Sequence, residues 1–408
     1  MSLARLWESL LPIGRDDPAG GYRRYAFTQA EMACRSWFRA AAAERDLAVS
    51  ADRNANLWAW WDPPAGDRGS GAIVTGSHLD SVPDGGAFDG PLGVASGFAA
   101  IDLLRERGFV PARAVAVAAF CEEEGARFGL ACLGSRLLTG TQDPAAARAL
   151  RDGAGVTLAE AMSAAGYDPA LIGPDEDLLG GIGAFVELHV EQGLALAEPP
   201  GAAIGIAAGI WPHGRWRFEF TGQADHAGTA RLAGRRDPML PFAATALAAR
   251  ECAGSLGTLA TFGKIAAEPG GVNAISSSVR AWLDARAPDQ DGLDLTVVRI
   301  HAAADHAARR HGVALSVAPE SLTPPVGFDP ELRDRIAAVL GAAGIDAPVL
   351  ATGAGHDAGV LAARVPTAML FVRNPSGVSH APAEHAEPAD CELGVIALAA
   401  VLEDLACR

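Results

Sequence analysis

Residues 72–90 read AIVTGSHLDSVPDGGAFDG, and this stretch decides the fold. The apolar run at 72–75 is typical of a buried strand, and the Gly, Asp and Pro residues after it favour a loop. A helical pattern follows at 90–107, and two more apolar runs lie at 112–120, just before Cys-Glu-Glu-Glu-Gly, and at 184–190. Strands that alternate with helices predict an α/β sheet with parallel strands.

The pattern of predicted strands and helices changes after about residue 210. The order of predicted elements there is β-α-β-β-α-β, the split unit of ferredoxin-like domains. These elements are a strand at 215–222, a helix at 237–253, two strands within 258–286, a helix at 291–311 and a strand at 313–320. The α/β pattern returns after Pro324, with strands at 349–352 and 367–372 and a closing helix at 391–405. Near the N-terminus, residues 28–49 have a helical pattern.

This order predicts a small domain inserted into a larger one. We expect a catalytic domain at 1–211 and 326–408, with the inserted domain at 212–325. The prolines at 198–200 and 324–325 mark expected hinges.

Length, charge and cysteine content limit the class of protein to which the chain can belong. A chain of 408 residues suggests two or three domains. The net charge of −16 argues against nucleic acid and against an anionic membrane surface as partners. The six cysteines form no CxxC pair, so we expect scattered thiols in a reducing compartment. Neither a secretory leader nor an apolar stretch of membrane-spanning length is recognisable, so the predicted location is the cytoplasm.

Polar side chains follow the first predicted strand. His78 and Asp80 are two residues apart and face the same side of an extended segment, and a carboxylate commonly stands behind a metal-binding imidazole. Asp89 comes eleven residues after His78, within GGAFDG, whose glycines permit a tight bend. An ordinary turn rich in Asp and Gly would have the same composition.

Three adjacent carboxylates, Glu122, Glu123 and Glu124, follow the second predicted strand. Adjacent carboxylates repel one another, and such a run is usually a solvated loop. Its place at the carboxyl end of a buried strand, where open α/β sheets build their sites, favours metal binding instead.

The third predicted strand has a polar face made by Glu187, His189 and Glu191, and a buried polar face needs a reason. His380 follows the strand at 367–372; alone, it would more often be a structural histidine than a ligand. Together, imidazole and carboxylate ligands at strand ends suit Zn, Mn, Co or Ni and a two-metal hydrolytic centre, with a spare carboxylate of the Glu run as general base. The sequence contains no HExxH, P-loop, GxSxG or GxGxxG motif, which argues against serine hydrolases and nucleotide-binding proteins.

Seven segments then appear in order along nearly the whole chain: TGSHLDSVPDGGAFDGPLGV, FCEEEGARFG, ELHVEQG, GQADHAGT, LDARAPD, GAGHDAG and GVSHAPAEH. In this order they resemble the amidase/hydantoinase-carbamoylase branch of the zinc aminopeptidase-like amidohydrolases. Its members include N-carbamoyl-L-amino-acid hydrolases, allantoate amidohydrolases and β-ureidopropionases.

The resemblance implies a zinc-aminopeptidase-like catalytic domain that holds two divalent metal ions per subunit. By the resemblance, the first ion is held by His78, Asp89 and His189, and the second by Asp89 as a bridge, Glu124 and His380. Glu123 is implied as the general base that activates water, and Asp80 as the group that orients His78.

The resemblance also makes the inserted ferredoxin-like domain a lid and the dimerisation surface of a homodimer. In that domain His226 is implied to stabilise the developing oxyanion. The substrate carboxylate is implied to bind Arg215, Asn273 and Arg286, together with Gln192 and the backbone near Gly355.

Two departures from the family pattern lie in the inserted domain. Ala230-Arg231-Leu232 stand where the family usually has Thr-Pro-Met, and Ala274-Ile275-Ser276-Ser277 where it usually has Ile-Pro-Gly. These departures do not affect the predicted metal ligands, but they leave the identity of the substrate undecided.

The expected function is therefore metal-dependent hydrolysis of the carbamoyl C–N bond of N-carbamoyl-L-amino acids, small ureido acids. Allantoate or another ureide is the alternative substrate. A non-catalytic binding protein on the same fold is the second alternative, which the complete set of expected ligands argues against.

Overall fold

The apolar runs around His78 and the Glu122–Glu124 segment form the middle of a large sheet. The structure, a computed structural model, describes residues 3–16, 18–64, 68 and 71–407. The chain divides into two units, Met1–Gly209 with Gly327–Arg408 and, between them, Ile210–Val326. They are called unit 1 and unit 2.

The large sheet has nine strands within the described residues, in the order β1-β2-β4-β3-β5-β15-β6-β13, with β14 paired to β6. Its strands are β1 (Ala48–Ala51), β2 (Leu57–Trp61), β3 (Ala72–His78), β4 (Val115–Phe120), β5 (Ile182–Val190), β6 (Ile204–Ile210), β13 (Val326–Gly327), β14 (Val349–Thr352) and β15 (Thr367–Val372). The central strands β4, β3, β5 and β15 are parallel, whereas β2 and β6 pair with them in antiparallel fashion. The predicted parallel α/β sheet is thus a mixed sheet with a parallel centre.

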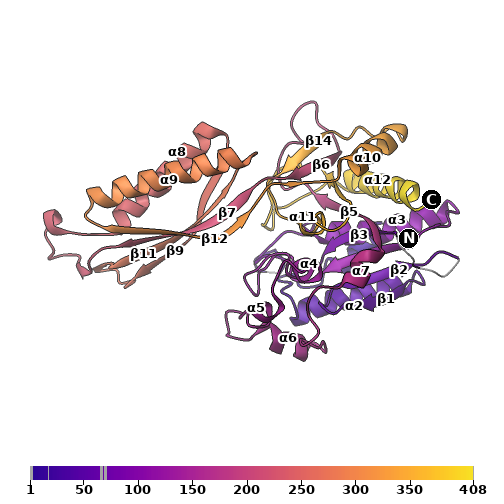
Figure 1. Ribbon diagram of the computed structural model, residues 1–408, viewed down its shortest axis with the longest axis horizontal. Helices are drawn as coiled ribbons and strands as arrows, with labels where there is room; N and C mark the ends of the chain where they lie inside the picture. The colour runs from indigo at the N-terminus through magenta and orange to yellow at the C-terminus, as the bar shows by residue number, and fades with distance from the viewer. Residues whose placement is uncertain (1–2, 17, 65–67, 69–70, 408) are drawn as a thin grey trace. The chain divides into compact units, whose positions relative to one another are not determined.

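Helices cover both faces of the sheet in unit 1 (Figure 1). They are α1 (Leu3–Leu10), α2 (Gln29–Ala43), α3 (Pro91–Glu106), α4 (Leu133–Thr139), α5 (Pro144–Arg148), α6 (Leu158–Ala164), α7 (Glu176–Gly181), α10 (Pro330–Ala342), α11 (Asp357–Leu361) and α12 (Pro388–Ala406). Helix α3 packs on β3, β5 and α12, and its apolar side chains are buried nearly all round, as expected for a helix enclosed in a core. Proline in the first turn of α3 and of α12 presets the helical φ angle without losing a hydrogen bond.

Unit 2 contains a four-stranded antiparallel sheet in the order β12-β7-β11-β9. Its elements are β7 (His213–Thr221), β8 (Asp225–His226), the 3-10 turn η1 (Leu232–Gly234), α8 (Met239–Leu256), β9 (Leu259–Glu268), β10 (Ala274–Ile275), β11 (Ser278–Arg286), α9 (Gln290–Arg310) and β12 (Ala314–Thr323). Helices α8 and α9 lie side by side on one face (Figure 1). Trp216, Phe218 and Phe220 alternate with polar residues along β7 and form the core beneath the helices. The four main strands and two helices therefore follow the predicted β-α-β-β-α-β order.

Several predicted boundaries are wrong. The predicted helix at 28–49 ends at Ala43, because Asp46 takes a left-handed φ of 49° and the chain then enters β1. The first strand extends to His78, beyond its apolar run, and the second begins at Val115 rather than 112. Strands β1, β2 and β6 and helices α4 to α7 were not predicted.

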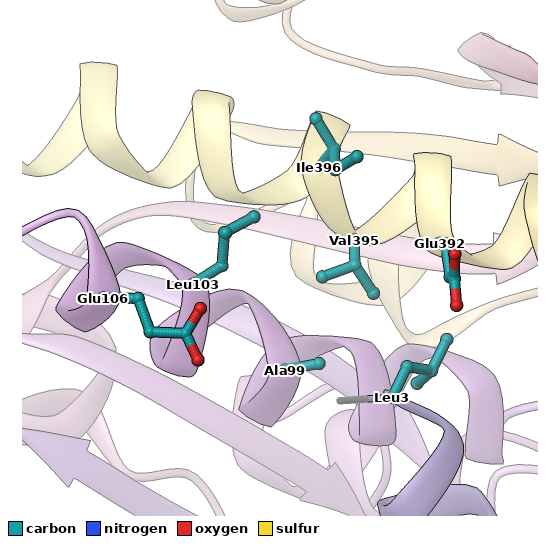
Figure 2. A pocket seen from close by; sticks show the side chains of 7 residues that line it. All are labelled: Leu3, Ala99, Leu103, Glu106, Glu392, Val395 and Ile396. Carbon is teal, nitrogen blue, oxygen red and sulfur yellow. The ribbon is translucent and has the colours of Figure 1, made fainter. Parts of the chain in front are cut away.

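A shallow groove of about 240 Å³ opens on unit 1 between α1, α3 and α12 (Figure 2). Apolar side chains form most of its wall, and Glu106 and Glu392 lie beside them. None of the predicted site residues lines this groove. Among the described helices, none is both long enough and apolar enough to cross a membrane.

Candidate active site

The predicted ligands of unit 1 meet because their strands are parallel and end at one edge of the sheet. His78 is the last residue of β3 and lies in register with Phe120, the last residue of β4. His189 lies one residue before the end of β5, in register with Phe371 on β15. The loops that carry the Glu run and His380 therefore leave the sheet on the same side.

Asp89 lies at the centre of this cluster. Its Oδ1 is 3.2 Å from Nε2 of His189 and 3.6 Å from Nε2 of His78, and its Oδ2 is 3.3 Å from Nε2 of His380. Burial opposes ionisation of Asp89, but the three imidazoles outweigh it and hold the pKa of this carboxyl well below its ordinary value. The side chain is 6% exposed and offers one oxygen to each side of the cluster.

The potential ligand atoms form two groups that share Asp89. One consists of His78, Asp89 and His189, and the other of Asp89, Glu124 and His380; within each group the atoms lie within 4.8 Å of one another. These are the two triplets that the family resemblance implies. A carboxylate common to two ligand sets is the arrangement that a two-metal centre requires.

The residues present fit a bound cation. Within the described part of the chain, Nε2 of His78, Nε2 of His189 and Oε1 of Glu124 are buried and make no well-formed hydrogen bond, although both imidazole nitrogens face Oδ1 of Asp89. Buried polar atoms without partners are rare in native proteins and call for an explanation such as an ion. The ring Nδ1 atoms are held from behind, by Asp80 for His78 and by the carbonyl of Val190 for His189, so Nε2 is left to bind.

The Glu run carries strong electrostatic repulsion. Burial first, and then the neighbouring carboxylates, raise the pKa of Glu124 to about 7 and that of Glu122 to about 8. Burial likewise raises the pKa of Glu123 well above its ordinary value. A cation among these carboxylates would relieve the repulsion and stabilise their ionised forms.

Glu123 occupies the place that a general base needs. Its side chain is buried, and Oε2 lies 3.7 Å from Nε2 of His78, beside the first ligand group. It belongs to neither of the two groups that share Asp89. A carboxylate beside such a centre that holds no ligand position can accept a proton from water.

Asp80 does more than the sequence predicts. Its Oδ1 lies 3.4 Å from Nδ1 of His78, consistent with the expected orienting role. The same carboxylate also accepts the backbone N–H groups of Glu123 at 3.2 Å and Glu124 at 3.1 Å. Asp80 therefore fixes the loop after β4 against the loop after β3.

Local backbone geometry directs the ligands inward. Glu122 and His380 have φ angles of 54° and 55°, a left-handed conformation that is uncommon for residues with a side chain and is concentrated at functional sites. Gly90, next to Asp89, has φ 83°, and a Cβ there would lie 2.4 Å from the His78 ring. Only glycine permits this close approach, which explains the last glycine of GGAFDG.

Glu384 is a site residue for which the sequence predicted no role. Its Oε1 accepts the backbone N–H groups of Phe88 and Asp89, both at 2.9 Å, and its Oε2 accepts the Ser379 hydroxyl at 3.0 Å. The buried carboxylate thereby links the Asp89 loop to the His380 loop. The segment GVSHAPAEH contains Glu384, but nothing in its spacing identifies the partner.

His356 was also missed as a neighbour of the centre, and Glu187 was noted only as part of the polar face of its strand. The His356 ring lies 4.5 Å from that of His189, centroid to centroid, and its buried Nε2 has no partner. Glu187, His189 and His356 form a third group at ligand distance. Glu187 already accepts hydrogen bonds from the Ser77 hydroxyl and the Ala358 N–H, so it serves better as support behind His189 than as a ligand.

Two predicted substrate residues belong to unit 1. Gln192 donates to Oδ2 of Asp89 at 2.9 Å, and its Nε2 lies 3.3 Å from Nε2 of His380, so it borders the second ligand group. Gly355 is exposed and immediately precedes His356.

The four remaining predicted residues belong to unit 2. His226 and Asn273 are exposed and close together, since β8 pairs with β10 and the Ala227 N–H donates to the Asn273 carbonyl. Arg286 donates to both oxygens of Asp284, and Arg215 contacts the same carboxylate at 3.5 Å. Burial raises the pKa of Asp284, but the two guanidinium groups more than offset this and lower it.

Imidazoles and carboxylates gathered at the carboxyl edge of an α/β sheet define a metal-dependent hydrolase. The chain belongs to Peptidase family M20/M25/M40, whose family model matches residues 74–404. The resemblance to the hydantoinase/carbamoylase branch is confirmed by individual relatives.

The chain is 36% identical to an N-carbamoyl-L-amino acid amidohydrolase of Geobacillus stearothermophilus over 396 residues, which cover 96% of this chain and 95% of the relative. It is 31% identical to an allantoate amidohydrolase of Escherichia coli over 394 residues, 96% and 94% of the two chains. Its structure is similar to that of a hydantoinase/carbamoylase-family amidase of Burkholderia vietnamiensis, with a TM-score of 0.89, 30% identity and coverage of 100% and 98%.

Proposed function

We propose that this protein hydrolyses the carbamoyl C–N bond of N-carbamoyl-L-amino acids at a two-metal centre in unit 1. The observation that carries the proposal is the Asp89 carboxylate, which is shared by two complete ligand groups and has Glu123 beside it. The substrate class is supported by the relative from Geobacillus stearothermophilus, which is similar along nearly the whole chain.

Five residues would hold the two ions: His78, His189, Asp89, Glu124 and His380. Two divalent ions, Zn, Mn, Co or Ni, would polarise the ureido carbonyl and lower the pKa of the attacking water. Their ligands are hard oxygen and imidazole donors without thiolate, which matches these metals.

Glu123 performs the proton transfers in this proposal. Its carboxylate accepts a proton from the attacking water as the water oxygen bonds to the ureido carbon. The bond between the ureido carbon and the departing nitrogen then breaks. That nitrogen leaves with the proton that Glu123 had accepted. Release of ammonia and loss of CO2 from the carbamate leave the free amino acid.

His356 is suited to bind the substrate beside this centre. The surrounding burial, and then the His189 ring, lower the pKa of His356 well below its ordinary value, so its imidazole is neutral at neutral pH. A neutral imidazole can donate one hydrogen bond to a developing oxyanion without repelling the cations.

Unit 2 would supply recognition of the substrate carboxylate and the lid. Arg215, Asp284 and Arg286 together carry one net positive charge, since two guanidinium groups share one carboxylate. A guanidinium offers a planar fork that matches a second carboxylate. Asn273 and His226 are the other polar groups that we assign to the substrate.

The homodimer would form through unit 2. Leu240 and Leu247 on α8 are 50% and 70% exposed, and Ala243 and Ala244 between them are exposed as well. These residues recur at helical spacing and form one apolar stripe, which a second copy of the chain would cover.

A substrate panel tests the proposal. Metal-free protein is loaded with Mn, Zn, Co or Ni and offered N-carbamoyl-L-amino acids, allantoate and their amides, with ammonia and amino acid as the measured products. Turnover of an N-carbamoyl-L-amino acid above all others is the expected result. Preferred turnover of allantoate would establish the alternative supported by the Escherichia coli relative, and metal binding without any hydrolysis would establish a binding protein.

A further inference from the structure

Cys132 contacts the carboxylate that we assign as the general base. It is 4% exposed and immediately precedes α4, and its Sγ donates to Oε1 of Glu123 at 3.3 Å. The other oxygen of Glu123, Oε2, faces Nε2 of His78. The two oxygens of one carboxylate therefore have different surroundings.

The backbone around this contact is held in place. The N–H groups of Cys132, Leu133 and Gly134 donate to the carbonyls of Glu123, Glu122 and Cys121, respectively, at 2.6, 3.1 and 2.9 Å. Cys132 and the first two residues of α4 thus run antiparallel to the segment Cys121–Glu123. Both ends of the contact belong to fixed backbone, and the side-chain torsions of Cys132 and Glu123 are the freedom that remains.

The conformation of Cys132 itself restricts what can replace it. Its φ angle is 55°, in the left-handed region, where β-branched residues are strained but Ala and Ser are tolerated more easily. Burial, and then the charge of Glu123, raise the pKa of the Cys132 thiol well above its ordinary value. The sulfur therefore keeps its proton and acts as a donor.

We propose that Cys132 is a positioning residue, whose thiol holds Oε1 of Glu123 so that Oε2 stays directed toward the reacting water. The inference rests on the proposed role of Glu123 as base. Without the thiol, Oε1 is a buried acceptor without a partner, and the carboxylate can turn away from the centre. In the metal-loaded protein, where cations would stabilise the ionised form of Glu123, the thiol donates to a charged acceptor, so its loss is expected to cost about tenfold in turnover.

Two variants of Cys132 test this inference. Cys132→Ala removes the donor, whereas Cys132→Ser restores a donor in a side chain of similar size. We expect kcat to fall about tenfold in the Ala variant with KM and bound metal unchanged, and the Ser variant to recover most of the loss. Equal losses in Ala and Ser, or an unchanged kcat in Ala, would overturn the proposal.

Cys391→Ala is the matched control, because Cys391 is also 4% exposed but lies in α12 and contacts none of the site residues named above. It reports what loss of a buried thiol does to the fold alone, so its kcat should match the wild type. In a Glu123→Gln background, Cys132→Ala should have no further effect on the residual rate, since the carboxylate it positions is gone. A further tenfold loss in that background would assign the effect to structure.

An infrared measurement separates this inference from the proposed function. The S–H stretching band of Cys132 is the band that disappears in Cys132→Ala. It should shift in Glu123→Gln, because the acceptor changes from a carboxylate to an amide. An unshifted band refutes the hydrogen bond whatever the protein hydrolyses, whereas a shifted band in a protein that hydrolyses no ureido acid refutes only the catalytic assignment.

Discussion

Replacement of Glu384 should weaken metal binding although Glu384 is not a ligand. Its carboxylate accepts the N–H of Asp89, the proposed shared ligand, and the hydroxyl of Ser379, the residue before His380. Asp89 and Glu384 are 295 residues apart in the chain. The carboxylate therefore helps to set the distance between the Asp89 loop and the His380 loop, together with the direct contacts of Asp89 with Ser379 and His380.

The size of the effect follows from these contacts. Glu384→Ala leaves one buried and one part-buried backbone N–H group without its acceptor, at about 1–3 kcal/mol for the buried one. Loss of such a supporting partner usually weakens metal affinity by about 10- to 100-fold. We expect the upper end, about a hundredfold or 2.7 kcal/mol, because three hydrogen bonds are lost together. Glu384→Gln keeps one acceptor oxygen, so its loss should be nearer tenfold.

The assay is calorimetric titration of metal-free protein with Mn²⁺ in the presence of a competing chelator. Urea unfolding of the metal-free variants measures the separate effect on the fold. Glu387→Ala is the matched control, since this exposed carboxylate lies three residues further along and contacts only His385 among the hydrogen bonds found for its side chain. Wild-type affinity in Glu384→Ala, or an equal loss in Glu387→Ala, would refute the reasoning.

Four further results are expected. Glu123→Gln should bind metal like the wild type and lose about a thousandfold in kcat, since the proton acceptor is gone while the ligands remain; near-normal turnover would exclude Glu123 as the base. Removal of metal with EDTA should abolish activity and lower Tm, and added divalent metal should restore both; full activity in protein shown to be metal-free would contradict the two-metal centre. Arg286→Ala should cost about 2–5 kcal/mol in kcat/KM on a substrate with a free carboxylate and little on its amide; a loss of about 0–1 kcal/mol on both would leave Arg286 as an ordinary partner of Asp284. Leu247→Glu should shift the protein from dimer to monomer in analytical ultracentrifugation, and an unchanged mass would remove α8 from the interface.

The parts of the site that could be predicted are those governed by sheet geometry. Buried parallel strands are recognisable in the sequence as apolar runs, and their carboxyl ends lie at one edge of the sheet. His78, the Glu run, His189 and His380 therefore had to lie close together once their strands were recognised. The Glu run is the clearest case, because its composition alone indicated a solvated loop and its position after β4 decided otherwise.

The helices and strands that were not predicted have only weak patterns in the local sequence. Helices α4 to α7 are five to seven residues long, too short to establish a helical period. The sequence LWAWW of β2 has no alternation, because both its faces are largely buried. The readable signals in that stretch were helix starts: Asp143-Pro144 before α5, the capping box of Thr157 and Glu160 at α6, and Asp175 before α7.

Supporting residues were missed for a different reason. Glu384 and Cys132 act through hydrogen bonds to Asp89 and Glu123, and no periodicity or spacing encodes which partner a side chain will meet across a fold. Metal ligands are recognisable because their chemistry is unusual at a strand end, whereas the groups that hold them are ordinary residues in loops.

Arg286 shows why two readings of one residue need not exclude each other. An arginine in the sequence LDARAPD can pair with Asp284 or recognise a substrate carboxylate. The pairing is present, with Nε of Arg286 donating to Asp284 at 2.8 Å. Arg215 approaches the same carboxylate at 3.5 Å, so one negative charge serves two guanidinium groups, and its two short contacts orient Arg286. A guanidinium that is oriented in advance loses less side-chain entropy when it binds a second carboxylate, and the observed ion pair thus favours the functional reading instead of replacing it.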